Sequence, residues 1–262
     1  MKDNILAALE SLGVTPRQTP RGLVASMRMG VMKREAVIDL DAFVETLPQG
    51  DTRTIAQNAA RGILAVINEP GNSTAASMSF IDTTPSISPA AEGPGFAEGV
   101  AAAGGGAPFF QPYVGELQLA YYIDLDDGQR LLTQQQVDDW GVHPERVEKA
   151  GLSILFHRSG YERWENHLID GVLIHRMAIG DGGDAARATL IEMFDYAKAQ
   201  AGRLFALPSS GTLLFTDTTD EAALRVLKKV ARGAFEKASD PLCRDIFVCR
   251  EGKLVREAIA QI

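Results

Sequence analysis

The sequence predicts an α+β protein in which mixed or antiparallel sheets carry helices packed on one face. Two observations lead to this prediction: strand-like segments follow one another across short turns, and each half of the chain reads strand, strand, helix, strand. The composition is that of a globular protein, because 45% of the 262 residues are hydrophobic and 23% are charged. The repeated order raises the question of two similar α+β halves, although no sequence similarity between them supports a duplication.

Residues 1–70 are expected to form an N-terminal α+β unit. Apolar residues recur at helical spacing over 1–12, and strand patterns follow at 23–29 and 36–43. A longer helix is expected over 51–67, where Pro70 and Gly71 end the helical pattern.

The stretch 71–112 is expected to be a loose connection. It is dense in Gly, Pro, Ala and Ser, with Gly104-Gly105-Gly106 at its most flexible point. Such a composition does not readily offset the entropy that is lost on ordering. Residues 113–262 then form a C-terminal α+β unit.

The clearest signal in the C-terminal unit is a hairpin at 161–179, where Asp170-Gly171 is a favoured two-residue turn. After it we expect a helix over 185–201, strands at 204–207 and 212–216, a helix over 221–238 and two terminal strands. The turn fixes the register of the hairpin, which pairs Leu168 with Leu173, Asn166 with His175 and Trp164 with Met177 on one face.

Charge and hydropathy narrow the classes of partner. The chain has 26 basic and 34 acidic residues, a net charge of -8, and no cluster of Lys and Arg stands out along it. Because such a surface repels a phosphate backbone, nucleic acid is not expected as a partner. No apolar stretch approaches the roughly 20 residues of a membrane span, and the first residues are not expected to act as a signal sequence. We therefore expect no membrane partner and a cytoplasmic location.

The most informative segment runs from Asp181 to Arg187 and reads Asp-Gly-Gly-Asp-Ala-Ala-Arg. Asp184 is placed to cap the helix that follows, and a glycine-rich turn before a helix can also offer N–H groups to a ligand. Two aspartates oppose a phosphate and favour a cation. Because no Gly-x-Gly-x-x-Gly or Walker-type motif is present, no nucleotide cofactor is expected.

Histidines and cysteines give weaker signals. The hairpin register places His167 and His175 on opposite faces, which argues against a histidine metal site, and no metal is expected. His175 is either a catalytic histidine or a core histidine hydrogen-bonded to Asn166. Cys243 and Cys249 are expected to be buried, reduced thiols on one face of a strand, because their spacing matches no common zinc site.

The chain resembles the YtpQ family, a class of uncharacterised bacterial proteins of similar length. The resemblance covers roughly residues 108–262 and the order of elements. It implies a cytosolic bacterial α+β protein and no reaction, because the family has no established activity or catalytic residues. The segments that carry it are Glu116-Leu117-Gln118-Leu119 with Tyr121-Tyr122 and Leu125-Asp126, the segment from Asp181 to Arg187, and Ala206-Leu207-Pro208 before Leu213-Leu214.

Two functions are compatible with these patterns. The first is a non-enzymatic binding or regulatory module that acts through contacts with another protein, because turns and helix caps explain most of the polar residues. The second is a metal-assisted or acid/base enzyme that uses the acidic loops at 181–184 and 217–220. If the strands before these loops are neighbours, we expect the loops to lie side by side. The oligomeric state is left open. The candidate catalytic residues are Asp181, Asp184, Asp217 and His175.

Overall fold

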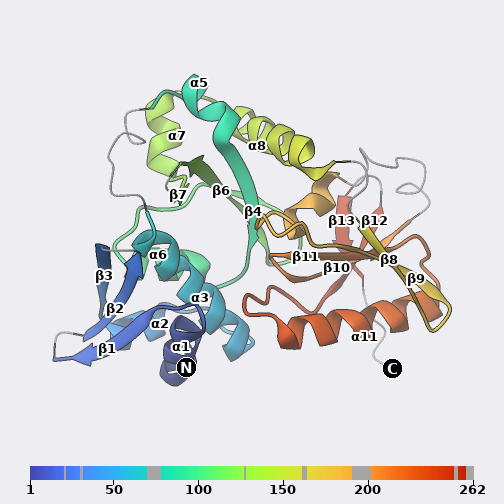
Figure 1. Cartoon of the computed structure of the whole chain (residues 1–262), viewed down its shortest axis with the longest axis horizontal. Coiled ribbons are helices and arrows are strands. Elements are labelled where there is room, and N and C mark those ends of the chain that lie inside the picture. Colours follow the sequence, from blue (N-terminus) through green and yellow to red (C-terminus); the bar gives the residue numbers. More distant parts are fainter. Residues whose placement is uncertain are drawn as a thin grey trace. The chain divides into compact units, whose positions relative to one another are not determined.

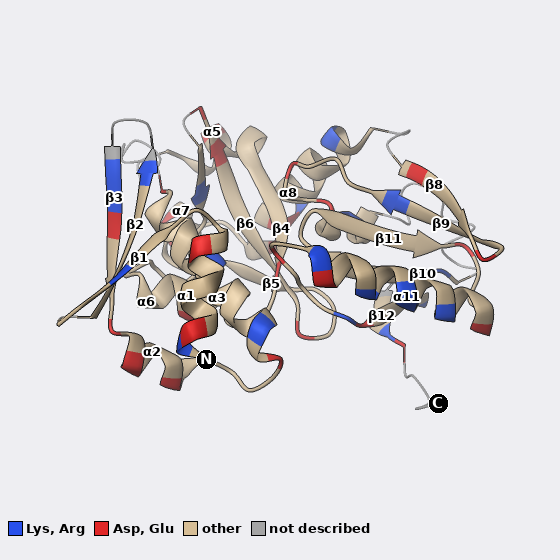
Figure 2. Ribbon diagram, turned by 60° about the horizontal axis from the view of Figure 1, so that its bottom comes forward, with Lys and Arg blue, Asp and Glu red and all other residues tan. Residues whose placement is uncertain are grey.

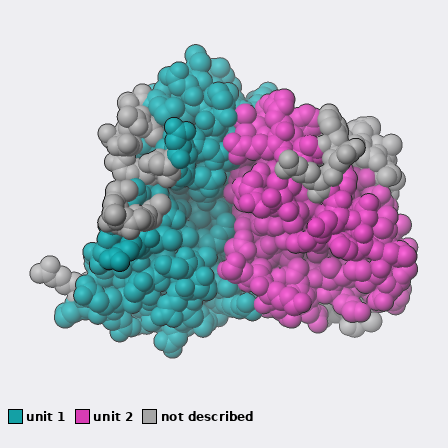
Figure 3. Space-filling view, viewed as in Figure 1, with its two compact units in different colours: residues 1–88, 92–111, 120–151 teal, residues 89–91, 112–119, 152–262 magenta. Residues whose placement is uncertain are grey.

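The computed structural model describes residues 1–20, 22–29, 32–69, 78–126, 128–160, 164–190, 202–250 and 253–257. The chain divides into two compact units, which are coloured separately in Figure 3. Their segments alternate along the chain, whereas the sequence suggested a boundary within 71–112. Unit 1 comprises Met1–Ser88, Glu92–Gln111 and Ala120–Gly151, and unit 2 comprises Pro89–Ala91, Pro112–Leu119 and Leu152–Ile262.

Unit 1 begins with a helix, a three-stranded antiparallel sheet and two further helices (Figure 1). Side chains from α1, α3 and the sheet form its core, including Ile5, Leu9, Leu23, Ile38 and Ile63. The bounds are α1 Lys2–Ser11, β1 Thr15–Thr19, β2 Gly22–Met29, β3 Met32–Ile38, α2 Leu40–Thr46 and α3 Thr52–Ile67.

The strand predicted at 36–43 is wrong in its second half. The carboxylate of Asp39 accepts hydrogen bonds from the N–H groups of Asp41 and Ala42, at 3.1 and 3.2 Å, so the chain becomes helical at Leu40. β1 was not predicted, because its residues are polar and show no apolar alternation. The cap of α3 is Asp51, whose carboxylate accepts from the N–H groups of Arg53 and Thr54.

The stretch predicted as a loose connection is ordered over its described part, residues 78–112; residues 70–77 lie outside the described parts of the chain. Gly99 of this stretch and Gly62 of α3 allow α6 to pack tightly on α3. A Cβ added to Gly99 would lie 2.0 Å from the backbone oxygen of Ala59, and one added to Gly62 would lie 2.1 Å from that of Phe96. The elements are α5 Phe80–Thr83, the 3-10 turn η1 Thr84–Ser86, β4 Ile87–Glu92, α6 Phe96–Ala102 and β5 Phe110–Pro112.

A second sheet has the order β4-β6-β5, with β7 paired to β6. At its end in unit 1, the buried carboxylate of Glu92 accepts from Arg61 at 2.9 Å and from the hydroxyl of Tyr122 at 2.8 Å. The remaining elements of this part are β6 Gln118–Leu125, β7 Gly128–Leu131, α7 Gln134–Trp140 and α8 Pro144–Ser159.

Unit 2 contains a six-stranded sheet with the order β13-β12-β10-β11-β9-β8, in which each pair is antiparallel. The α+β prediction is confirmed. The suggestion of two similar halves is not reproduced, since the strand orders of the sheets differ. The bounds are β8 Trp164–Ile169, β9 Val172–Met177, η2 Ala185–Leu190, β10 Leu204–Ser209, β11 Thr212–Thr216, α11 Glu221–Lys237, β12 Ile246–Arg250 and β13 Lys253–Arg256.

One face of the six-stranded sheet is covered by α11. Asp220 caps this helix by accepting from the N–H of Ala223 at 2.7 Å. Leu227 of α11 packs with Ile174, Leu204 and Leu214 of the sheet. Among the described helices, none is both long enough and apolar enough to cross a bilayer.

The predicted register of the β8–β9 hairpin is confirmed at every pair. Asp170 and Gly171 both have positive φ, 49° and 80°, as a type I′ turn requires. The hairpin therefore places Trp164, Asn166 and His175 on the face of the sheet opposite Ile174 and α11.

Candidate functional site

The segment from Asp181 to Arg187 forms a buried ion-pair network in unit 2. The side chain of Arg187 has no exposed surface, and it binds both carboxylate oxygens of Asp181 at 2.7 and 2.6 Å. It also donates to Asp184 at 3.2 Å and to the hydroxyl of Ser159, the last residue of α8, at 2.9 Å. Such a two-pronged pairing with a carboxylate is the geometry that a guanidinium favours.

Asp184 does not act as the predicted helix cap. Its carboxylate accepts from the N–H groups of Ile179 and Gly180, which precede it, each at 2.9 Å. The helix expected over 185–201 is a 3-10 helix over Ala185–Leu190, and residues 191–201 lie outside the described parts of the chain. Asp184 is fully buried, and it ties the end of β9 to Arg187.

The network leaves these carboxylates little freedom for chemistry. Burial acts to raise the pKa of Asp181, but hydrogen bonds and charge from Arg187 outweigh it, so the pKa is lowered from its ordinary value. A carboxylate held ionised by a buried guanidinium is poorly matched to general acid or base catalysis near neutral pH. We infer that the role of Asp181 and Asp184 is structural.

His175 and Asp217 belong to a second cluster, on the aromatic face of the sheet. The ring of His175 stacks on Phe215 at 4.6 Å, its Nδ1 lies 2.7 Å from Oδ1 of Asn166, and its Nε2 lies 3.7 Å from Asp217. The buried Arg203 contacts Asp217 at 2.7 Å. The hydrogen bond between His175 and Asn166 is the one that the hairpin register predicted.

The two acidic loops lie at opposite ends of one strand. β9 and β11 are neighbours, as the enzyme hypothesis required, but they are antiparallel, so the loop after β9 meets the start of β11 while Asp217 follows its end. The N–H of Ala185 accordingly bonds the carbonyl of Ser210, just before β11, at 2.9 Å. At about 3.3 Å a residue, β11 separates the loops by roughly 13 Å. The expectation that they lie side by side is therefore wrong.

The other histidines and the cysteines lie apart from these clusters. Within the parts of the chain that the structure describes, no three His, Cys, Asp or Glu side chains are grouped as a metal site would require. Nδ1 of His143 accepts from the N–H of Glu145 at 3.4 Å, and Nε2 of His167 lies 3.3 Å from Glu165. Cys243 precedes β12 rather than lying in it, so the prediction of two thiols on one strand face is wrong.

The thiols should react very slowly in the folded protein. Burial raises the pKa of Cys243 to about 12, and Cys249 is buried. Because the thiolate is the reactive form, we expect labelling of Cys243 by a disulfide reagent at pH 8 to be at least about 100-fold slower than for free cysteine. Site-resolved mass spectrometry measures this, with the protein in guanidinium as the control. Cys243 is half-buried, not buried as expected, and labelling at the rate of free cysteine would contradict its raised pKa.

Sequence reasoning missed a cationic surface on α11. Arg225, Lys229 and Arg232 are exposed and spaced at i, i+4 and i+7, so they lie along one side of the helix, with Lys228 beside them (Figure 2). We call these four residues the α11 basic face. The signal was present in the sequence, but it appears only when the charges are read at helical spacing rather than as a run.

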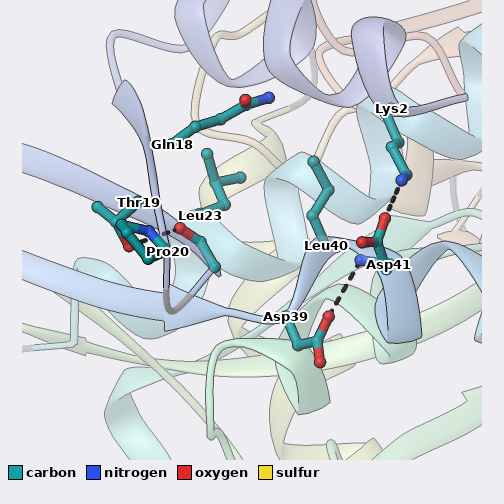
Figure 4. A pocket seen from close by; sticks show the side chains of 9 residues that line it. Lys2, Gln18, Thr19, Pro20, Leu23, Asp39, Leu40 and Asp41 are labelled. Carbon is teal, nitrogen blue, oxygen red and sulfur yellow. Dashed lines mark hydrogen bonds and ion pairs between the residues drawn. The ribbon is translucent and has the colours of Figure 1, made fainter.

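Unit 1 contains a hollow of about 460 Å³ at the start of α2 (Figure 4). Its charged groups already have partners, because Lys2 pairs with Asp41 and Asp39 caps α2. Each charged side chain that lines the hollow is therefore already engaged with another group of the hollow.

Comparisons of the chain with protein-family models, with curated proteins and with solved structures find no match. The resemblance to the YtpQ family stays a prediction.

Proposed function

We propose that the chain is a non-enzymatic binding or regulatory module that acts through protein contacts, with the α11 basic face as its contact surface. The observation that carries this proposal is four cations within about two turns of an exposed helix, on a chain whose net charge is -8. A concentrated patch of charge opposite to that of the whole surface attracts and orients a partner of complementary charge. The proposed partner is an acidic segment of another protein.

The short length of the α11 basic face favours a protein partner over a nucleic acid. Arg225 and Arg232 are about 10 Å apart along the helix axis, and Glu221 and Glu236 lie one turn beyond them on the same side. A long polyanion would extend over these glutamates and be repelled, whereas a short acidic segment would not. Of the large hydrophobic side chains found exposed in the described residues, none lies on α11, so the helix offers nothing to insert into a lipid surface.

A cytoplasmic location is part of the proposal. Cys243 and Cys249 are reduced cysteines rather than a disulfide, and Cys249 is buried, which suits a reducing compartment.

The alternative function, acid/base catalysis, now rests on His175 and Asp217. The carboxylate of Asp217 lies 3.7 Å from the imidazole of His175, which is longer than a hydrogen bond, and it also contacts Arg203 at 2.7 Å. The pair could orient a catalytic histidine only if the two side chains moved closer together. Asp181 and Asp184 no longer support it, because their carboxylates are committed to Arg187.

The test is fluorescence anisotropy with a labelled polyglutamate peptide at low ionic strength. We expect the triple variant R225E/K229E/R232E to bind the peptide at least about tenfold more weakly than the native chain, because three attractions become repulsions. The matched control R17E/K33E/R53E makes the same change of net charge at exposed sites of unit 1 and should retain most of the affinity.

Two results would overturn the proposed function. One is equal loss of affinity in both triple variants, which would indicate a response to net charge alone. The other is tighter binding of a DNA duplex of equal charge than of polyglutamate by the native chain.

A further inference from the structure

The edge strand β8 exposes apolar side chains, which proteins normally avoid or cover at the edge of a sheet. β8 is the last strand of the six-stranded sheet, and no other described strand pairs with its outer side. Leu168 is 75% exposed, and its cross-strand neighbour Leu173 is 44% exposed. An uncovered edge with exposed apolar residues is a ready template for pairing with another strand.

The turn determines which backbone groups of β8 face outward. In a two-residue hairpin the residues that flank the turn, here Ile169 and Val172, form a hydrogen-bonded pair, and such pairs then alternate along the ladder. The peptide groups of Glu165, His167 and Ile169 therefore point toward β9. Those of Trp164, Asn166 and Leu168 point away from β9, toward the side on which a new strand would add.

We propose that two copies of the chain associate through β8, with the strands antiparallel around a two-fold axis at Asn166. This register makes Asn166 face its own copy and aligns the outward peptide groups of Trp164 with those of Leu168 in the partner copy. It uses each of the outward-facing peptide groups on both strands.

In this register the side chains of β8 in one copy complement those of β8 in the other copy. On one face, the exposed Leu168 lies opposite Trp164 of the second copy, which gives two aromatic–aliphatic pairs. On the other face, Glu165 lies opposite His167, so a carboxylate meets an imidazole twice. These are the kinds of cross-strand pair that stabilise antiparallel sheets. Both members of the charged pair are solvent-exposed, by 59% and 49%, so the second copy can reach them. Within one copy Glu165 accepts from Arg176 at 2.8 Å and lies 3.3 Å from His167, and the new contact would be shared with these.

A shift of the axis to His167 gives a worse fit. That register sets the two copies of His167 against each other, and it pairs Glu165 with Ile169 and Asn166 with Leu168. The shifted register therefore loses the pairing of Glu165 with His167, and it sets polar side chains opposite apolar ones. The pairing around Asn166 is the one that the residues favour.

The dimer would have a consequence for α11. A two-fold axis at this edge runs perpendicular to the joined sheet, so both copies of α11 lie on the same side of it. The two basic faces would then be presented together, and a partner with two acidic segments could engage both. The pairing itself rests on β8 and stands whether or not α11 binds anything.

Oxidative cross-linking tests the pairing and its register. An edge of six residues buries less surface than the roughly 1,200 Å² of stable complexes, so a weak dimer that a disulfide can trap is expected. In N166C the two Cα atoms would be about 5.5 Å apart, within disulfide range. In H167C the two substituted residues would be offset by two positions along the strands. Their Cα atoms would be roughly 8 Å apart, too far for a disulfide.

We expect N166C to form a covalent dimer on mild oxidation, seen on a non-reducing gel, while H167C and the native chain stay largely monomeric. Cross-linking of H167C instead would show the shifted register and overturn the axis at Asn166. Cross-linking of both variants at equal rates, or of neither, would overturn the pairing through β8.

A charge swap tests the complementarity without a disulfide. E165K should weaken association, because a lysine then faces His167 of the second copy. E165K/H167E restores opposite charges across the axis and should recover association, measured by sedimentation at high protein concentration. Unchanged unfolding temperatures would show that these exposed substitutions leave the fold intact. Failure of the double variant to recover association, with the fold intact, would contradict the pairing of Glu165 with His167.

Discussion

Replacing Arg187 with methionine is expected to lower the free energy of unfolding by about 3–5 kcal/mol. The change removes the guanidinium that neutralises Asp181 and the fully buried Asp184, and it leaves a carboxylate uncompensated away from water. It also leaves the buried hydroxyl of Ser159 without the donor at 2.9 Å. Denaturant unfolding followed by circular dichroism measures the loss.

Two companion variants separate the causes. Arg187→Lys keeps the charge but cannot reproduce the two-pronged pairing, so an intermediate loss is expected. Arg225→Met removes an arginine whose partner, Glu221, is equally exposed, and it should change stability by less than about 0.5 kcal/mol. If Arg187→Met lowered the free energy of unfolding no more than Arg225→Met does, the ion pairs of Arg187 would not stabilise the segment from Asp181 to Arg187.

The same network should make the free energy of unfolding depend on pH in the acid range. The pKa of Asp181 is lower in the folded chain than its ordinary value of about 3.9. Its contribution to stability is therefore fully present above that ordinary value and is lost as the pH falls through the lower, folded-state pKa. In Asp181→Asn this part of the acid dependence should disappear, which unfolding measured across the acid range would show. An unchanged acid profile would contradict the assignment.

Replacing Gly99 with alanine is expected to destabilise unit 1 by about 3 kcal/mol, the upper end of the usual cost of overpacking. The new Cβ would lie 2.0 Å from the carbonyl oxygen of Ala59, and a backbone atom in a helix cannot move aside as a side chain can. Gly62→Ala should behave alike, because its Cβ would meet the carbonyl of Phe96 at 2.1 Å. Both losses appear as lower denaturant midpoints.

Gly233 of α11 provides the matched control. It also lies within a helix, but nothing lies within 4 Å of an added Cβ, and its φ is not positive. Gly233→Ala should therefore stabilise the protein by up to about 1 kcal/mol, the difference in helix propensity. If Gly99→Ala were equally stabilising, the close approach of α3 and α6 would be contradicted.

Local signals were enough to predict the elements that depend on local chemistry. Asp170-Gly171 determined a hairpin register that holds at each pair, and Asp51 and Asp220 cap the helices that were expected. Where a glycine-rich composition was interpreted as looseness, the prediction failed, because Gly99 allows α6 to pack closely on α3. Composition alone does not distinguish glycine that permits flexibility from glycine that permits contact.

The candidate site depended on long-range geometry that the sequence does not display. The separation of Asp181 from Asp217 follows from the antiparallel pairing of β9 with β11, which no local pattern specifies. The burial of Arg187 depends on Ser159, 28 residues earlier in the chain. The segment from Asp181 to Arg187 was therefore recognisable as distinctive, while its structural role required the fold.

We propose that the chain binds acidic protein segments through α11 and not through its acidic loops. The most direct measurement is the map of backbone amide shifts by nuclear magnetic resonance as polyglutamate is added. Shifts centred on residues 225–232, with little change at 181–187, are the expected result. Shifts centred on Asp181 to Arg187, or around His175 and Asp217, would contradict the claim and support the catalytic alternative.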